Sequence, residues 1–196
     1  MIALTSLTPE ELDTFYPLLQ AHFPPSELKK LPHLHSLYDS GVYDMWKLMA
    51  DDKVKGLALL LHGTGCRYVL LDYLVMIEKD HGYGSACLKA LQAQYPEGVM
   101  LEAEALLEGL SEEVLHTRRR RLDFYKRAGW TAVPFRNRVF GEVYLIHLWA
   151  KDFPENAKEV CRRELYLAYR EQVPLVAKFD ANVFIEGYND PKEEEI

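Results

Sequence analysis

This sequence has little cysteine, few long apolar runs and little positive charge. Each of these shortages excludes some classes of protein. The 196 residues include three cysteines that lie far apart, Cys66, Cys87 and Cys161. Neither a disulfide framework nor a CxxC metal site is therefore expected, and we predict a reducing, cytoplasmic location. No run approaches the ~18 apolar residues of a membrane span, and the first residues lack the pattern of a secretion signal. We expect neither membrane spanning nor secretion.

The deficit of positive charge bears on the partners of the protein. Its formal net charge is −7 at pH 7. A protein that binds nucleic acid normally has a basic face, so no nucleic-acid partner is expected. An acidic field attracts cations and slightly favours a cationic small substrate. The 48% of hydrophobic residues are enough for a sizeable core, and the length fits one domain with a short appendage.

The most informative stretch joins an apolar strand to a helix through two glycines. Leu70 to Ile77 is a nearly continuous apolar run, typical of a central strand buried on both faces. Gly82 and Gly84 follow, and apolar residues then recur at helical spacing from Ala86 to Leu91. Glycine lets the backbone turn sharply and bring its N–H groups close to a ligand. The free N–H groups of the helix's first turn would then bind a diphosphate.

Two glycines between a strand and a helix more often form a plain turn than a ligand site. The GxxxxGK(S/T) pattern of nucleoside-triphosphate loops is absent. The third glycine of the Rossmann fingerprint is also absent, because Ser85, Ala86 and Cys87 follow Gly84. A plain turn and an NAD-binding domain stay open as alternatives, the second weakened by the missing glycine.

A specific resemblance favours a coenzyme site. Residues 79–84, Lys-Asp-His-Gly-Tyr-Gly, resemble the acetyl-coenzyme A signature of the GCN5-related N-acetyltransferases (GNATs), R/Q-x-x-G-x-G/A, although Lys79 replaces the usual Arg or Gln. The resemblance implies acetyl-coenzyme A as cofactor, with its diphosphate on the loop's backbone amides and its pantetheine arm against the end of the strand. The cofactor-binding residues that it implies are Val75, Met76, Ile77, Lys79, His81, Gly82, Tyr83, Gly84 and Ser85.

Alternation and turn signals place strands and helices along the rest of the chain. Strands are expected at 1–6, 43–50, 53–62, 66–77, 98–104, 130–134 and 142–151, and further helices at 9–23, within 26–37, from 112 or 117 to 128, and at 155–171. The second helix should be interrupted near Pro32, and Phe135 to Gly141 should connect the last two of these strands. By the right-handed crossover rule, the strand at 98–104 should lie parallel to the central strand.

These elements predict an α/β (α+β) fold with a mixed, mostly antiparallel sheet. The GNAT resemblance implies in addition that the central parallel strands splay apart and that helices flank the sheet. Residues 1–150 would form this domain. Residues 151–196 would form a C-terminal extension packed on or beside it, with a helix, a short strand at 183–188 and an acidic tail. Whether the extension covers the cleft or mediates a homodimer is left open.

Two carboxylates alternate with apolar residues in the strand at 98–104. Glu102 and Glu104 should therefore lie on one face of it, and on an arbitrary strand that face would simply be solvated. Here Leu101-Glu102 resembles the Leu-Glu that begins the equivalent strand in GNATs whose Glu assists amine deprotonation. A carboxyl beside a partly dry cleft can have its pKa raised into a useful range. The resemblance thus implies Glu102 as general base, directly or through water, with Glu104 as second choice.

A second segment, residues 124–130, matches the family's pattern of an aromatic followed by x-x-x-G-F/W. Tyr125 falls where many members place the tyrosine that protonates the departing coenzyme A thiolate. A phenol with a pKa of about 10 is a suitable donor to a thiolate of similar basicity. Members also often have an Asn after the preceding strand to bond the pantetheine arm, and none lies between Met100 and Trp130.

The resemblance implies an N-acetyltransferase that transfers an acetyl group from acetyl-coenzyme A to a primary amine by direct attack. This chemistry needs positioning and proton handling, so no metal is expected. The acceptor would be a small molecule or a peptide, with a slight preference for a cationic small amine. The main alternative is a non-catalytic acyl-coenzyme A-binding or regulatory module of the same fold, motivated by Lys79 and the missing Asn.

Overall fold

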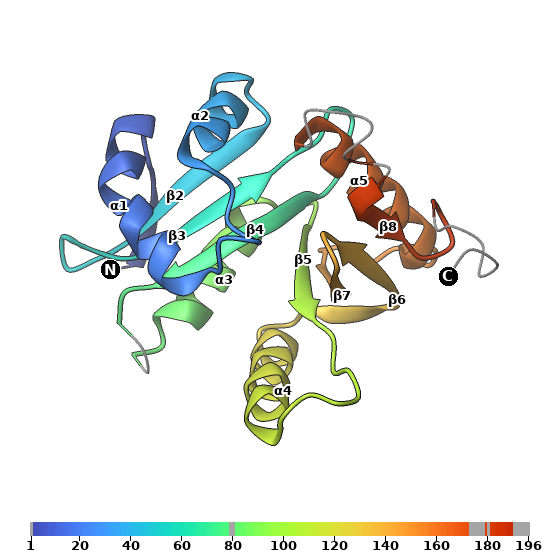
Figure 1. The fold of residues 1–196 in the computed structure, drawn as a ribbon. Coiled ribbons are helices and arrows are strands. Elements are labelled where there is room, and N and C mark those ends of the chain that lie inside the picture. The colour runs from blue at the N-terminus through green and yellow to red at the C-terminus, as the bar shows by residue number, and fades with distance from the viewer. Residues whose placement is uncertain (1, 79–80, 173–178, 180, 190–196) are drawn as a thin grey trace.

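A mixed sheet with helices on both faces organises the protein, as the computed structural model shows (Figure 1). Residues 2–78, 81–172, 179 and 181–189 are described. The elements in chain order are β1 Ile2–Ser6, α1 Pro9–His22, α2 Leu31–Asp39, β2 Tyr43–Ala50, β3 Lys53–Leu61, β4 Val69–Met76, α3 Tyr83–Gln94, β5 Val99–Glu104, α4 Glu112–Arg127, β6 Thr131–Val139, β7 Glu142–Trp149, α5 Ala157–Gln172 and β8 Val183–Ile185.

In this described part of the chain the strands form one sheet in the order β1-β2-β3-β4-β5-β7-β6-β8. Only β4 and β5 pair in parallel, and all other neighbours are antiparallel. The predicted fold class is thus confirmed, including the parallel placement of the strand after the glycine turn. None of the described helices combines the length and the low polarity that a membrane-spanning helix requires.

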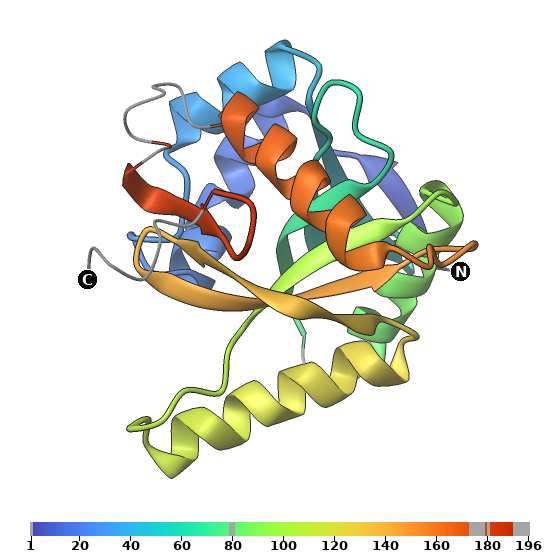
Figure 2. The same ribbon diagram turned by 90° about the vertical axis from the view of Figure 1, so that its right-hand side faces the viewer.

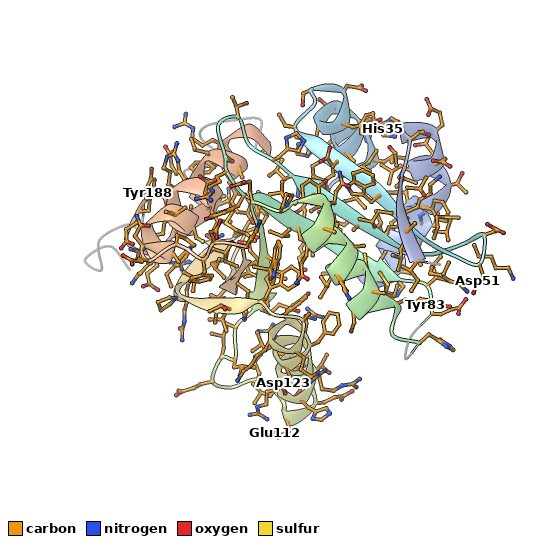
Figure 3. The ribbon with its side chains drawn as sticks, turned by 180° about the vertical axis from the view of Figure 1, so that it is seen from behind. His35, Asp51, Tyr83, Glu112, Asp123 and Tyr188 are labelled. Carbon is orange, nitrogen blue, oxygen red and sulfur yellow. The ribbon has the colours of Figure 1, made fainter. Side chains whose placement is uncertain are left out.

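Local chemistry explains the first half of the sheet. Thr8 and Glu11 form a capping box at the start of α1, with Thr8 N–H donating to Glu11 Oε2 over 3.0 Å and Glu11 N–H to Thr8 Oγ1 over 3.3 Å. Asp51 (Figure 3) and Asp52 turn the β2–β3 hairpin. Their φ angles are 50° and 57°. Two consecutive left-handed residues match the twist of the flanking strands, and Asp tolerates this conformation better than most residues.

Two boundary predictions involving proline were wrong. Pro32 does not interrupt the second helix but lies in its first turn, where its missing N–H has no intrahelical partner to lose. The strand expected to stop at Pro134 continues as β6 to Val139. Its register with β7 shifts between Val133 and Arg136, so Pro134 falls in an irregularity where the sheet tolerates an absent donor. The longer strand places Asn137 inside the sheet.

The two faces of the sheet carry separate apolar cores. One core lies under α1, α2 and α5, and the other under α3 and α4. Figure 2 shows α5 on one side of the sheet and α4 on the other. Within the extension, Cys161 and Leu165 are fully buried in the first core, and β8 pairs with β6 at the edge of the sheet. The described part of the extension therefore packs into the same apolar core as residues of the domain at 1–150. Its expected acidic tail, residues 192–195, lies outside the described residues.

Candidate active site

The two parallel strands at the centre of the sheet separate after a short contact. β4 and β5 pair only at Val69–Leu71 with Val99–Leu101, although β4 continues to Met76 and β5 to Glu104. At the point of separation Asp72 is an extra residue, because Leu60 pairs with Leu71 and Leu59 with Tyr73. Such a bulge bends the strand and increases its twist. The predicted splaying of the parallel strands is thus present, and it begins where the bulge lies in β4.

A cavity of about 440 Å³ lies at this opening. It brings together the three residues that the resemblance marks as catalytic, Glu102 and Glu104 from β5 and Tyr125 from α4. Asp72 enters from β4, and the remaining wall mixes apolar and aromatic side chains with His22, Glu27 and Arg121. The lining residues are His22, Phe23, Pro24, Glu27, Leu71, Asp72, Tyr73, Leu74, Leu101, Glu102, Glu104, Arg121, Tyr125 and Tyr144.

Glu102 is held by two neutral donors. The Asn137 amide donates to Oε1 over 2.5 Å, and the Tyr169 hydroxyl donates to Oε2. Burial raises the pKa of Glu102 to about 7, against the opposing effect of these two hydrogen bonds; Asp72 raises it further and Lys29 lowers it. A carboxyl with this pKa exchanges a proton readily at neutral pH, which is what a general base requires.

Glu104 is in a different environment, because it forms an ion pair with Arg121 of α4. Arg118, one turn earlier on the helix, donates to the carbonyl oxygen of Ala105 over 2.6 Å. The two arginines thus fasten α4 to the end of β5. The Glu104 carboxylate is thus already engaged by a cation, whereas the Glu102 carboxylate contacts only neutral donors, so the geometry favours Glu102 over Glu104 as the candidate base.

Tyr125 lies in the last turn of α4, and 9% of its surface is exposed. Burial raises the pKa of its phenol, while Arg121 lowers it and Glu104 raises it. The phenol is therefore protonated at neutral pH and available as a donor. Its ring lies 5.3 Å from that of Phe124 and 6.2 Å from that of His147.

Asp72 is a member of the site that sequence reasoning missed. It accepts from the Tyr43 hydroxyl over 2.5 Å and from Lys29 Nζ over 2.6 Å and 2.9 Å. The available signal was that Asp72 is the only charged residue between Leu70 and Ile77. Asn137 and Tyr169 were missed as well, and no local pattern links them to Glu102.

The glycine turn has the conformation that its sequence predicts. Gly82 has φ of 74° and starts α3 without any side-chain cap. A Cβ at Gly84 would lie 3.2 Å from Phe124 Cζ, so this position requires a small residue. The first-turn N–H groups, from Tyr83 (Figure 3) to Ser85, therefore remain for an anion. His81 is exposed, with its ring 5.8 Å from the Tyr83 ring, whereas Lys79 lies outside the described residues.

The expected pantetheine contacts differ in their exposure. Val75 is buried in the core under α1 and α2, with 3% of its surface exposed. Met76 is half-buried on the opposite face, and Ile77 is exposed while its N–H donates to the Lys55 carbonyl over 2.9 Å. A ligand lying along β4 would therefore meet the backbone of Val75 and not its side chain.

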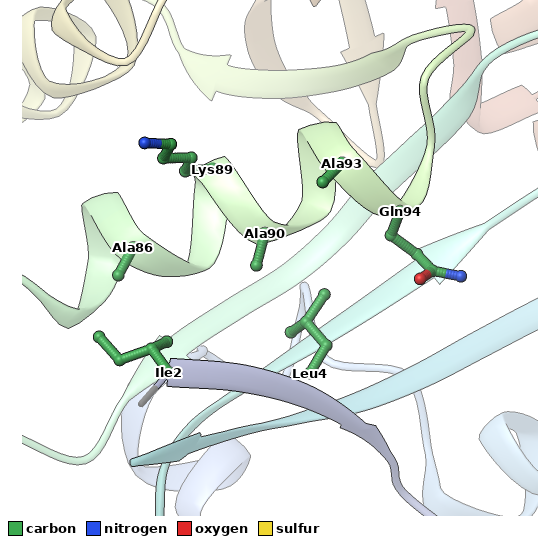
Figure 4. A pocket seen from close by; sticks show the side chains of 7 residues that line it. All are labelled: Ile2, Leu4, Ala86, Lys89, Ala90, Ala93 and Gln94. Carbon is green, nitrogen blue, oxygen red and sulfur yellow. The ribbon is translucent and has the colours of Figure 1, made fainter.

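Two other features carry no comparable chemistry. A hollow of about 550 Å³ between β1 and α3 has three alanines in its wall, and its one ionisable side chain, Lys89, points away from Ile2 and Leu4 (Figure 4). Among the described residues no three His, Cys, Asp or Glu side chains are grouped so that they could hold a metal ion.

Comparison with known proteins identifies the fold. No protein-family profile and no curated protein matches the chain, but solved structures do. A candidate acetyltransferase of the GNAT family from Bacteroides thetaiotaomicron has 21% identity and a TM-score of 0.67 over 83% of this chain and 95% of its own. The ribosomal-protein-S18-alanine N-acetyltransferase of Escherichia coli has 16% identity and a TM-score of 0.54 over 80% and 98%.

An aminoglycoside acetyltransferase, AAC(6′)-Ib, in complex with coenzyme A and kanamycin, has 14% identity and a TM-score of 0.56 over 83% of this chain and 99% of its own. The sheet is mixed and its two central parallel strands separate, so the chain is an α/β protein with a central cleft. The solved neighbours then show which fold this is: the chain has the GNAT fold.

The raised pKa of Glu102 has a consequence for stability. A carboxyl whose pKa is 4.5 when exposed and about 7 when folded binds more protons in the folded state, so its contribution to the free energy of unfolding falls as pH rises between these values. Glu102→Gln removes this titration. We expect the variant to gain about 3 kcal/mol relative to the parent between pH 4 and pH 8.

Urea unfolding at both pH values, with exposed Glu113→Gln as control, measures this difference. A stability difference between Glu102→Gln and the parent that does not change with pH would show that Glu102 has an ordinary pKa.

Proposed function

We propose that this protein is an acetyl-coenzyme A-dependent N-acetyltransferase. The observation that carries the proposal is the cavity between the separated strands, which holds a carboxyl with a pKa near neutrality and a protonated phenol. The presence of coenzyme A in a solved protein of the same fold supports it. A cytoplasmic location and a homodimer stay predictions.

The coenzyme would bind along the opening. Its diphosphate would accept from the uncapped N–H groups of Gly82 to Ser85, where the helix dipole also favours an anion. Its pantetheine arm would lie along the β4 backbone from Val75 to Ile77, whose β5 side has no strand partner in the described sheet. Unpaired backbone groups of β4 can hydrogen-bond to the amides of the arm and so replace the missing Asn.

The residues of the cavity would handle two protons. Acetyl-coenzyme A supplies the acetyl group as a thioester. Glu102 takes a proton from the acceptor ammonium, directly or through water, and the neutral amine attacks the carbonyl carbon. A C–N bond forms and the C–S bond breaks, while Tyr125 donates its proton to the departing thiolate. The new amide nitrogen then loses its second proton to solvent. Tyr125 regains a proton from solvent and Glu102 gives up the one it took, so one proton is released per turnover.

The charge of the cavity favours a small cationic amine as acceptor. Burial raises the pKa of Glu27, the nearby Glu104 and Glu142 raise it further, and Arg121 and Arg118 lower it only in part. Lys29 and Arg121 form ion pairs with Asp72 and Glu104, whereas the described contacts include no ion pair for the Glu27 side chain. A second ammonium group on the acceptor would relieve this repulsion, and aromatic residues such as Phe23 and Tyr144 would contact its methylene groups.

Release of free thiol from acetyl-coenzyme A across a panel of primary amines tests the activity. Tyr125→Phe should lower kcat by about 100-fold and leave KM for acetyl-coenzyme A within about twofold, because the variant loses a proton donor and keeps the ring. Tyr38→Phe, on α2 and away from the cavity, is the control. A Tyr125→Phe variant as fast as the parent would remove Tyr125 from the mechanism. Coenzyme binding without turnover on any amine would favour the acyl-coenzyme A-binding module.

The charge argument predicts a selective effect of Glu27→Gln. For a diamine, KM should rise about five- to tenfold, since one partly buried charge interaction is lost. For a monoamine of similar length, KM should stay nearly unchanged. Glu108→Gln, on an exposed loop, is the matched control. Equal changes for the two amines would exclude Glu27 as the position that binds the second charge.

A further inference from the structure

The C-terminal extension reaches the centre of the candidate active site through one side chain. Tyr169 lies on the buried face of α5, with 6% of its surface exposed, and donates its hydroxyl hydrogen to Glu102 Oε2. Ala168 and Leu165 on the same face are packed in the core, so the helix has little freedom to move the phenol away. A distant segment thus contacts the carboxylate that the proposed mechanism uses as a base.

Each carboxylate oxygen of Glu102 accepts a hydrogen bond from a side chain, and the two donors belong to different elements. Asn137 of β6, with 1% of its surface exposed, donates to Oε1, and Tyr169 of α5 donates to Oε2. Burial and the adjacent carboxylate raise the pKa of Tyr169 well above its ordinary value, so this phenol remains a donor at every pH of interest. Two donors on a carboxylate hold its plane in one orientation and favour its ionised form.

We propose that Tyr169 is a positioning residue for Glu102, through which the extension orients the general base and favours its ionised form. The proposal rests on the function proposed above for Glu102. Residues 151–196 would then take part in the reaction. This role differs from the two that the sequence left open for them, which were covering the cleft and mediating a homodimer.

The other charged and titratable groups around Glu102 do not replace this contact. Asp72 of β4 disfavours the charged form of Glu102, and Lys29, which favours it, already forms an ion pair with Asp72 over 2.6 Å. Tyr144 of β7 is near Glu102 and has its own pKa raised, chiefly by burial. On β5 itself, Glu104 is paired with Arg121. Removing the Tyr169 hydroxyl therefore removes one of the two direct donors, and among the described residues no unpaired cation next to Glu102 replaces it.

Tyr169→Phe tests the proposal because it deletes one oxygen and keeps the packed ring. Loss of a hydrogen bond to the charged form raises the pKa of Glu102, so the acid limb of kcat/KM should move upward by about one pH unit. The rate should be reduced about tenfold at pH 6 and approach the parental rate near pH 9. The matched control is Tyr166→Phe, one turn earlier on α5, whose hydroxyl accepts from Arg170 over 2.7 Å and does not contact Glu102.

A second readout does not depend on activity. The carboxyl carbon of Glu102, assigned by its loss in Glu102→Gln, can be titrated by ¹³C NMR in the parent and in Tyr169→Phe. We expect the same upward shift of about one pH unit. In a Glu102→Gln background, Tyr169→Phe should cause no further loss of rate, because the two residues act as a unit.

The outcomes separate this inference from the proposed function. An active parent whose acid limb and Glu102 titration are the same in Tyr169→Phe overturns the positioning role, as does a uniform loss of rate at all pH values. A parent without turnover on any amine overturns the proposed function, and the NMR titration then decides alone whether Tyr169 controls Glu102.

Discussion

The separation of β4 from β5 is the constraint on which the rest of the structure depends. After three paired positions the sheet divides into two halves, because β5 remains paired with β7 from Val99 to Glu104 while β4 remains paired with β3. The division leaves the β5 side of β4 without a strand partner after Leu71, and backbone groups there need a ligand or water to bond them. The extra residue Asp72 bends β4 where the contact ends, and a cavity occupies the opening.

Both halves of the sheet bring carboxylates to this cavity, and the environments of Asp72 and Glu102 differ in charge. Asp72 belongs to the first half and is compensated by Lys29 and by the Tyr43 hydroxyl. Glu102 belongs to the second half and is held by neutral donors, so burial raises its pKa to about 7. The difference between a compensated and an uncompensated carboxylate explains why Glu102 suits proton transfer and Asp72 suits a structural role.

The features that sequence reasoning predicted are those encoded by neighbouring residues. The apolar run, the glycine turn and the following helix specify β4, the uncapped start of α3 and the parallel crossover to β5. The continuation of β6 past Pro134 could not be predicted from the sequence. A strand tolerates proline where its pairing with the neighbouring strand is irregular, and that irregularity between β6 and β7 is visible only in the structure. Asn137 and Tyr169 come from distant elements, and only tertiary packing brings them to Glu102.

The central claim is that acetyl-coenzyme A binds along the opening between the strands and on the start of α3. Amide hydrogen exchange with and without saturating acetyl-coenzyme A tests it most directly. We predict slower exchange at residues 72–77 and 82–86 and unchanged exchange in α2 and β2. Protection confined to the hollow between β1 and α3, or no protection at all, would contradict the claim.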